Sequence, residues 1–152
     1  MFKSHFQCFT CSDESIERML LESVDVVVGI IWNENKFLVE RRRLDEKVDP
    51  GIVCLPGGHV KANESKEEAL ERELREELGI EAKRFQFICK NFYVASNGER
   101  QNAYCYLVTD YEGKPVCKSA QEVFWEDNIE NLSLDVDRKT ITKLREFIDV
   151  HE

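Results

Sequence analysis

The spacing of apolar residues changes several times along the chain, and its first part indicates strands. Residues 24–32 are β-branched and apolar, which predicts a buried strand. After a polar turn, the apolar positions of 36–40 predict a second strand that forms a hairpin with the first. A polar loop follows, and residues 52–55 predict a short strand that ends at a Pro-Gly-Gly turn.

The spacing then becomes helical. Ser65 and Glu68 form a capping-box pair, and Gly79 suits the position after a last helical turn, so a helix is expected over 65–78. A second amphipathic pattern over 137–150 predicts a closing helix.

Further elements are expected outside these two helices. Residues 84–94 and 101–109 predict paired strands, and 123–125 predicts another short strand. Residues 14–22 predict a short helix ahead of the main body. Because strands and helices do not alternate strictly, we expect an α/β chain of the α+β kind, with helices on the faces of a mixed sheet.

Composition narrows the possible environments and partners. The chain has 152 residues and a formal net charge of −9, which fits one domain with a hydrophobic core. No apolar run approaches the roughly 18–20 residues of a membrane span, and the first residues lack the layout of a secretory signal. An acidic chain without a long basic run is not typical of a protein that binds nucleic acid polymers or membrane surfaces. We therefore expect a cytoplasmic protein.

The chain has six cysteines. Cys89 and Cys105 lie in expected strands, where a free thiol acts as a small hydrophobe. Cys8 and Cys11 form a C-x-x-C motif, but no second such motif exists to complete a zinc site. We therefore favour an ordinary tail or edge strand there over a metal or redox role.

Three glutamates share one face of the expected helix 65–78. A helix turns about 100° per residue, so Glu76 lies at about −60° and Glu77 at about +40° from Glu73. A divalent cation would offset their repulsion, and ligands that are all oxygen suit Mg²⁺ or Mn²⁺ better than zinc. Judged on the helix alone, an ordinary solvated charged face is the simpler interpretation.

The wider spacing reverses that preference. Gly58 is followed after five residues by Glu64, after seven more by Arg72-Glu73-Leu74, and then by Glu76-Glu77 and Gly79-Ile80. This pattern resembles the signature of the Nudix hydrolase family, G-x5-E-x7-R-E-U-x-E-E-x-G-U with U aliphatic, at every specified position. The segments VVVGIIWNENKFLVERR, LPGGHV and QEVFWED are similar to parts of MutT-type Nudix proteins.

The resemblance implies a Nudix fold, a mixed β-sheet sandwiched between α-helices. It implies a Nudix hydrolase domain over residues 22–152, preceded by an N-terminal extension over 1–21. It also implies an Mg²⁺-dependent enzyme, with Mn²⁺ able to replace Mg²⁺, that hydrolyses a nucleoside diphosphate linked to another moiety. The expected partner is a small nucleotide, and a homodimer remains open.

By resemblance, the helix glutamates hold the cation and its neighbours position them. The expected ligands are Glu73, Glu76, Glu77 and the backbone carbonyl of Gly58. Arg72 would orient Glu73, and Glu64 would hold Arg72 through charge-assisted contacts. The base that deprotonates the attacking water is Glu76 or Glu77, or a glutamate of a later loop, for which Glu122 is the candidate.

The expected substrate contacts each have a simpler alternative. Arg41 and Arg42 would meet phosphate, or are solvated surface arginines. Gly57 and Gly58 allow close backbone approach, which an ordinary tight turn also needs. Asp137 could hydrogen-bond a purine base, although a helix N-cap is the preferred interpretation.

Three functions remain, in order of preference. The first is a MutT-like hydrolase that converts a (deoxy)nucleoside triphosphate to monophosphate and pyrophosphate. The second is an ADP-ribose or nucleotide-sugar pyrophosphatase. The third is a Nudix fold that only binds nucleotides, which a degenerate signature would favour, whereas the acidic residues and Arg72 are all present.

Overall fold

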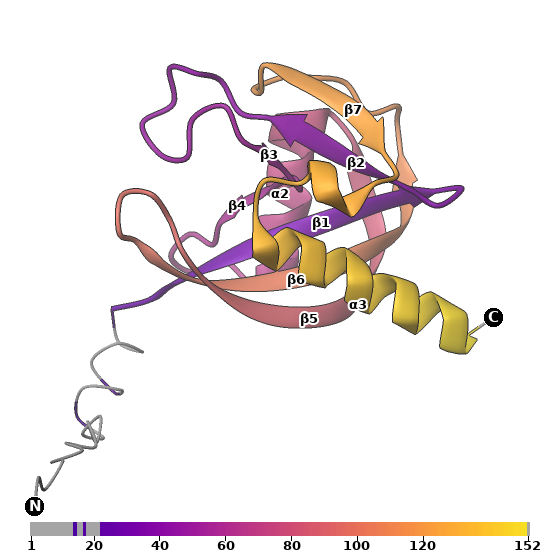
Figure 1. Cartoon of the computed structure of the whole chain (residues 1–152). Helices are drawn as coiled ribbons and strands as arrows, with labels where there is room; N and C mark the ends of the chain where they lie inside the picture. Colours follow the sequence, from indigo (N-terminus) through magenta and orange to yellow (C-terminus); the bar gives the residue numbers. More distant parts are fainter. Residues whose placement is uncertain (1–13, 15–16, 18–21, 152) are drawn as a thin grey trace, which may run out of the picture.

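The computed structural model describes residues 14, 17 and 22–151 (Figure 1). Of the helix expected over 14–22, it describes Glu14 and Glu17, which are helical, and Glu22. The Cys8–Cys11 motif and the rest of the expected extension lie outside the described residues.

The described elements match the expected order. They are β1 (Val24–Asn33), β2 (Lys36–Arg41), β3 (Val53–Cys54), β4 (Gly57–His59), α2 (Lys66–Leu78), β5 (Glu81–Val94), β6 (Arg100–Glu112), β7 (Glu122–Glu126), a 3-10 turn (Ile129–Asn131) and α3 (Asp135–His151). The expected strands and helices from residue 24 onward are all present, although their ends shift slightly. Strand β4 was not expected, because its two glycines indicate a turn.

Seven strands form one mixed sheet. Its order is β3-β2-β1-β6-β5, with β4 paired to β1 and β7 paired to β2. The β1–β6 pair is parallel, and the other pairs are antiparallel. This confirms the expected fold class.

The two helices cover opposite faces of the sheet (Figure 1). Side chains alternate along β2, so Leu38 packs with the leucines of α2, whereas Phe37 and Val39 pack with Ile141 and Leu144 of α3. Each face of the sheet thus has its own apolar core. Among the described residues, no helix has the length and apolar character that crossing a membrane requires.

Cys89 and Cys105 are cross-strand partners on β5 and β6. Cys105 is buried with Val26 and Ala103, and Cys89 packs against this cluster. Both are free thiols that pack with apolar neighbours. Their sulfur atoms also lie within hydrogen-bonding distance of the Thr140 hydroxyl, at 3.9 Å for Cys89 and 3.5 Å for Cys105, so they are not the purely apolar side chains that were expected.

Strand β4 depends on the absence of a side chain at Gly57. It pairs with β1 so that Gly57 lies opposite Val28. A Cβ atom at residue 57 would lie 2.0 Å from the backbone oxygen of Val27. The close pairing of β4 with β1 therefore requires glycine here.

We expect Gly57→Ala to lower the free energy of unfolding by about 3 kcal/mol, because backbone atoms of β1 would have to move. Urea denaturation measures this change. Gly98→Ala is the control: its Cβ meets nothing within 4 Å, but its φ of +84° costs about 1–2 kcal/mol. Equal losses in the two variants would contradict the close approach.

Candidate active site

Helix α2 places an acidic edge beside β4. The capping box of Ser65 and Glu68 is formed, and Gly79 ends the helix with a left-handed φ of 68°. The apolar face is buried against the sheet and consists of Ala69, Leu70, Leu74 and Leu78. The glutamates predicted to hold a cation follow this face on one side, and all line the same cavity: Glu73, Glu76 and Glu77.

Arg72 links these glutamates to the loop before the helix. Its Nε and Nη2 donate to the two carboxylate oxygens of Glu64, at 2.7 and 2.9 Å. Its Nη1 donates to Glu73 at 2.8 Å and to Glu76 at 3.2 Å, and its Nη2 also donates to the carbonyl of His59 at 2.9 Å. One guanidinium thus holds three carboxylates and the end of β4.

The hydrogen bonds between Arg72 and Glu64 keep both side chains charged. The hydrogen bond from Arg72 lowers the pKa of Glu64 from 4.5 to about 2, helped by the N–H of Lys61. The same hydrogen bond raises the pKa of Arg72 above its usual value. A charge-assisted bidentate pair of this kind fixes orientation as well as charge.

On the sheet side of α2, Glu77 is half-buried and Glu40 is buried. Burial raises the pKa of Glu77 to about 10, and the nearby Glu40 and Glu73 add to the shift, although the Gly57 N–H donates to Glu77 Oε2 at 3.2 Å. Burial also raises the pKa of Glu40 to about 7, against the effect of Arg42. One oxygen of Glu40, Oε2, is buried without a hydrogen-bond partner. Few donors are therefore available here to stabilise the charged forms of these two carboxyl groups.

Gly58 leaves the space that Glu73 occupies. A Cβ atom on residue 58 would lie 2.3 Å from the carboxyl group of Glu73. The absence of a side chain therefore allows the backbone of β4 to approach the acidic edge of α2 closely.

The donor set fits a hard divalent cation. The predicted ligands Glu73, Glu76 and Glu77 offer only carboxyl oxygens and line the cavity together with Gly58, and such oxygens suit Mg²⁺. The nearby Glu40 adds a buried carboxyl oxygen without a hydrogen-bond partner. Within the described ranges, no three His, Cys, Asp or Glu side chains already form a closed set of metal ligands. The fit thus rests on the chemistry and burial of the side chains.

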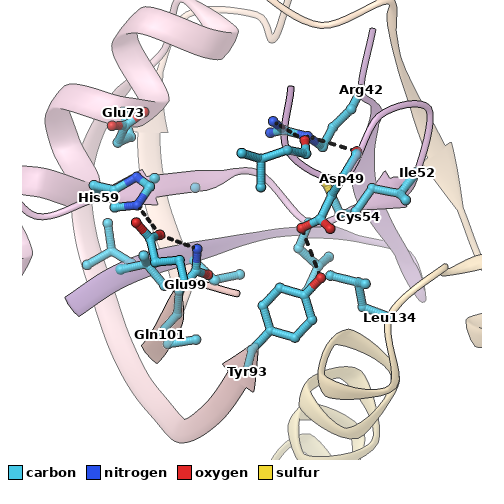
Figure 2. A pocket seen from close by; sticks show the side chains of 18 of the residues that line it. Arg42, Asp49, Ile52, Cys54, His59, Glu73, Tyr93, Glu99, Gln101 and Leu134 are labelled. Carbon is cyan, nitrogen blue, oxygen red and sulfur yellow. Dashed lines mark hydrogen bonds and ion pairs between the residues drawn. The ribbon is translucent and has the colours of Figure 1, made fainter. Parts of the chain in front are cut away.

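The acidic edge opens onto a cavity of about 870 Å³. Figure 2 shows Glu73 and His59 on one side and Tyr93, Cys54 and Leu134 on the other. The cavity therefore joins the anionic end of α2 to a region of mixed apolar and polar side chains, which is large enough for a small organic ligand.

Asp137 lies at that second region. It is 6% exposed, and its Oδ2 accepts a hydrogen bond from the Leu55 N–H at 3.2 Å. Burial raises its pKa from 3.8 to about 7, and the Leu55 N–H opposes the shift. The preferred N-cap interpretation is therefore wrong: α3 begins at Asp135, and the Asp137 carboxyl group bonds β3–β4 backbone rather than its own helix.

Arg41, the last residue of β2, and Arg42, which follows it, point to opposite sides. Arg42 lines the cavity, where it donates to the carbonyls of Val48 and Asp49. Arg41 pairs with Glu122 at 2.9 Å, and neither lines the cavity. Alternation along a strand explains this difference, and the structure does not bring the later-loop base candidate Glu122 to the site.

Several residues at the cavity were not expected from the sequence. Tyr93 donates to Asp49 Oδ2 at 2.9 Å and so ties the loop after β2 to β5. His59 and Gln101 both contact Glu99 at the opposite rim, at 2.6 and 2.9 Å (Figure 2). The Tyr93–Asp49 and His59–Glu99 contacts join residues 44 and 40 positions apart, so no local pattern indicates them.

Glu40 is a further buried carboxylate that the sequence analysis does not predict, although the sequence contains a signal for it. It stands two residues after the apolar Leu38, within a strand whose remaining interior positions are apolar. A charged residue in phase with the buried face of a strand is unusual and therefore informative.

Comparison with known proteins agrees with these observations. The sequence model of the NUDIX domain family matches residues 22–142. The chain is 35% identical over 118 residues to an 8-oxo-dGTP diphosphatase of Haemophilus influenzae, which covers 74% of this chain and 79% of the relative. It is 31% identical over 105 residues to a CTP pyrophosphohydrolase of Escherichia coli, which covers 69% of this chain and 76% of the relative.

A solved structure shows the same fold. The MutT NUDIX hydrolase from Burkholderia pseudomallei superimposes with a TM-score of 0.71 at 25% identity, over 80% of this chain and 98% of that one.

The raised pKa of Asp137 predicts a pH dependence of stability. Between pH 3.8 and about 7 the folded protein binds more protons at Asp137 than the unfolded chain, so stability falls as pH rises through this window. Asp137→Asn removes this titration and keeps an oxygen for the Leu55 N–H. We expect the variant to gain stability relative to wild type from pH 4 to pH 8, by up to about 4 kcal/mol. Urea denaturation across this range measures the difference, and a constant difference would contradict the assignment.

Proposed function

This chain belongs to the NUDIX domain family and is a Nudix hydrolase, and on that premise we propose that it hydrolyses a (deoxy)nucleoside triphosphate to the monophosphate and pyrophosphate. We assign this activity to a domain over residues 22–152, acting in the cytoplasm. The observation that carries the proposal is the acidic edge of α2, which Arg72 and Glu64 hold against a large cavity.

The relatives support a triphosphate substrate. Two that match more than two thirds of this chain are named as enzymes of 8-oxo-dGTP and of CTP. They differ in the base but share a triphosphate, which argues that the phosphate end of the site is common to them and that the base end varies.

The cation is assigned to Glu73, Glu76, Glu77 and the Gly58 carbonyl. Nudix hydrolases generally depend on a divalent cation, and we assign Mg²⁺, with Mn²⁺ as a substitute, because the donors are all oxygen. When bound, such a cation neutralises phosphate charge and stabilises the leaving group. Without it, the carboxylates would repel a polyphosphate.

The residues around the cation orient the carboxylates and deprotonate the attacking water. Arg72, held by Glu64, orients Glu73 and Glu76. We assign the base to Glu76, because its side chain is 55% exposed to solvent water, whereas that of Glu73 is 13% exposed. Glu77 is less suitable, because it is half-buried and its carboxyl group accepts a hydrogen bond from the Gly57 N–H.

The substrate extends from the acidic edge toward Asp137. Gly57 and Gly58 let the backbone approach the phosphates, and Arg42 supplies positive charge at the cavity wall. With a pKa near 7, Asp137 can accept hydrogen bonds from guanine N–H groups or, when protonated, donate one to an oxidised purine. This favours a purine triphosphate.

A panel of nucleotides tests the substrate. It contains canonical and 8-oxo-purine triphosphates, CTP, ADP-ribose and a nucleotide sugar, each with Mg²⁺, with Mn²⁺ and with chelator. We expect turnover of at least one triphosphate to monophosphate and pyrophosphate, abolished by chelator. Turnover of ADP-ribose alone would overturn the triphosphate assignment, and tight binding without any hydrolysis would overturn the catalytic assignment.

Single substitutions test the cation residues. We expect Glu76→Gln and Glu77→Gln each to lower kcat by about 10²–10⁴-fold, because a base or a ligand of the cation is lost. Glu112→Gln, an exposed glutamate at the far end of β6, is the matched control. Circular dichroism checks that each variant folds. Wild-type kcat in the two α2 variants would contradict the assignment.

A further inference from the structure

Glu40 lies on β2 with its side chain beneath α2. Its neighbour in phase, Leu38, belongs to the apolar cluster under α2, whereas Val39 belongs to the cluster under α3. Glu40 therefore shares the α2 face of the sheet. It is 5% exposed, so its carboxyl group is buried at the edge of this cluster.

Among the described residues, no donor satisfies Glu40 Oε2, which is buried without a hydrogen-bond partner. A buried polar atom in this state costs free energy, and a buried charge costs more unless it is paired. A merely structural glutamate would be expected to have a donor for this oxygen.

The charged groups near Glu40 do not supply that donor. Arg42 is close enough to act on it electrostatically, but the guanidinium donates to the Val48 and Asp49 carbonyls at 2.9–3.2 Å. The acidic Glu73 and Glu77 of α2 act on Glu40 with the opposite sign. Glu40 therefore adds another carboxyl group beside Glu73 and Glu77, where few hydrogen-bond donors are available.

We infer that Glu40 is a further ligand residue of the divalent-cation site, contributed by the sheet instead of by α2. The inference rests on the proposed function, which supplies the cation, and it extends the donor set beyond the residues of the helix. It explains why a buried carboxyl oxygen has no partner in the chain: its partner is the cation that Glu73 and Glu77 also bind.

Cation binding by the whole chain, without nucleotide, tests this role. Titration with Mn²⁺ is followed by electron paramagnetic resonance and calorimetry for wild type, Glu40→Gln and the exposed control Glu112→Gln. We expect Glu40→Gln to raise the Kd for Mn²⁺ about 10–100-fold, and the control to match wild type. Equal Kd values in wild type and Glu40→Gln would overturn the inference.

Thermal unfolding gives a second readout of opposite sign. Without cation, Glu40→Gln should raise Tm, because it removes a buried carboxyl group from an acidic cluster. With saturating Mn²⁺ the Tm of the variant should fall to that of wild type or below it, because bound cation stabilises wild type more than the variant. An Mn²⁺-induced Tm shift as large in the variant as in wild type would also overturn the inference.

A second variant keeps the inference testable if Glu40→Gln does not fold. Glu40→Asp keeps the charge on a side chain one methylene shorter, and it should bind Mn²⁺ more weakly than wild type but more tightly than Glu40→Gln. If only Glu40→Asp folds, a wild-type Kd in that variant contradicts the inference.

The outcome separates this inference from the proposed function. If Glu77→Gln loses Mn²⁺ binding while Glu40→Gln keeps it, only the role of Glu40 fails. If Glu77→Gln also binds Mn²⁺ as wild type does, the cation site itself fails, and the proposed function fails with it.

Discussion

The structure around the cavity depends on carboxylates that share a confined space. Arg72 offsets part of their repulsion by donating to Glu64, Glu73 and Glu76 at once. The same device does not serve the sheet side, where Glu77 receives a backbone N–H and Glu40 Oε2 receives nothing from the described residues. The carboxyl groups with the fewest hydrogen-bond donors therefore lie between α2 and β2, and a bound divalent cation there would favour their charged forms.

Backbone geometry maintains this arrangement as much as charge does. Strand β4 passes between β1 and the acidic edge of α2, and each of its glycines meets one neighbour. Gly57 lies against the Val27 carbonyl and donates to Glu77, and Gly58 leaves room for Glu73. A side chain at residue 57 would push β4 away from β1, and one at residue 58 would displace the Glu73 carboxyl group, so these two glycines set both the close approach of β4 and the position of Glu73.

Local signals in the sequence predict much of the molecule. The capping box and Gly79 place both ends of α2, and the 3.6-residue period places its glutamates on one side, because these effects act within a few residues. The paired glycines of β4 look like a turn, since only the pairing with distant β1 makes them a strand. Likewise, Arg41 and Arg42 are equivalent in composition, and only the phase of β2 against the core sends one to Glu122 and the other to the cavity. The partners of Glu40 and Asp137 depend on tertiary packing in the same way.

Burial raises the pKa of a carboxyl group at both ends of the cavity, but with different consequences. At the α2 end, the proposed cation would restore the charged form of Glu77, because it replaces the missing counter-charge. At the other end, Asp137 has one backbone N–H and no such cation, so a proton is what relieves it near pH 7. Burial thus leaves the α2 end with carboxyl groups that a cation would keep charged, and the other end with a carboxyl group that can both donate and accept hydrogen bonds near pH 7.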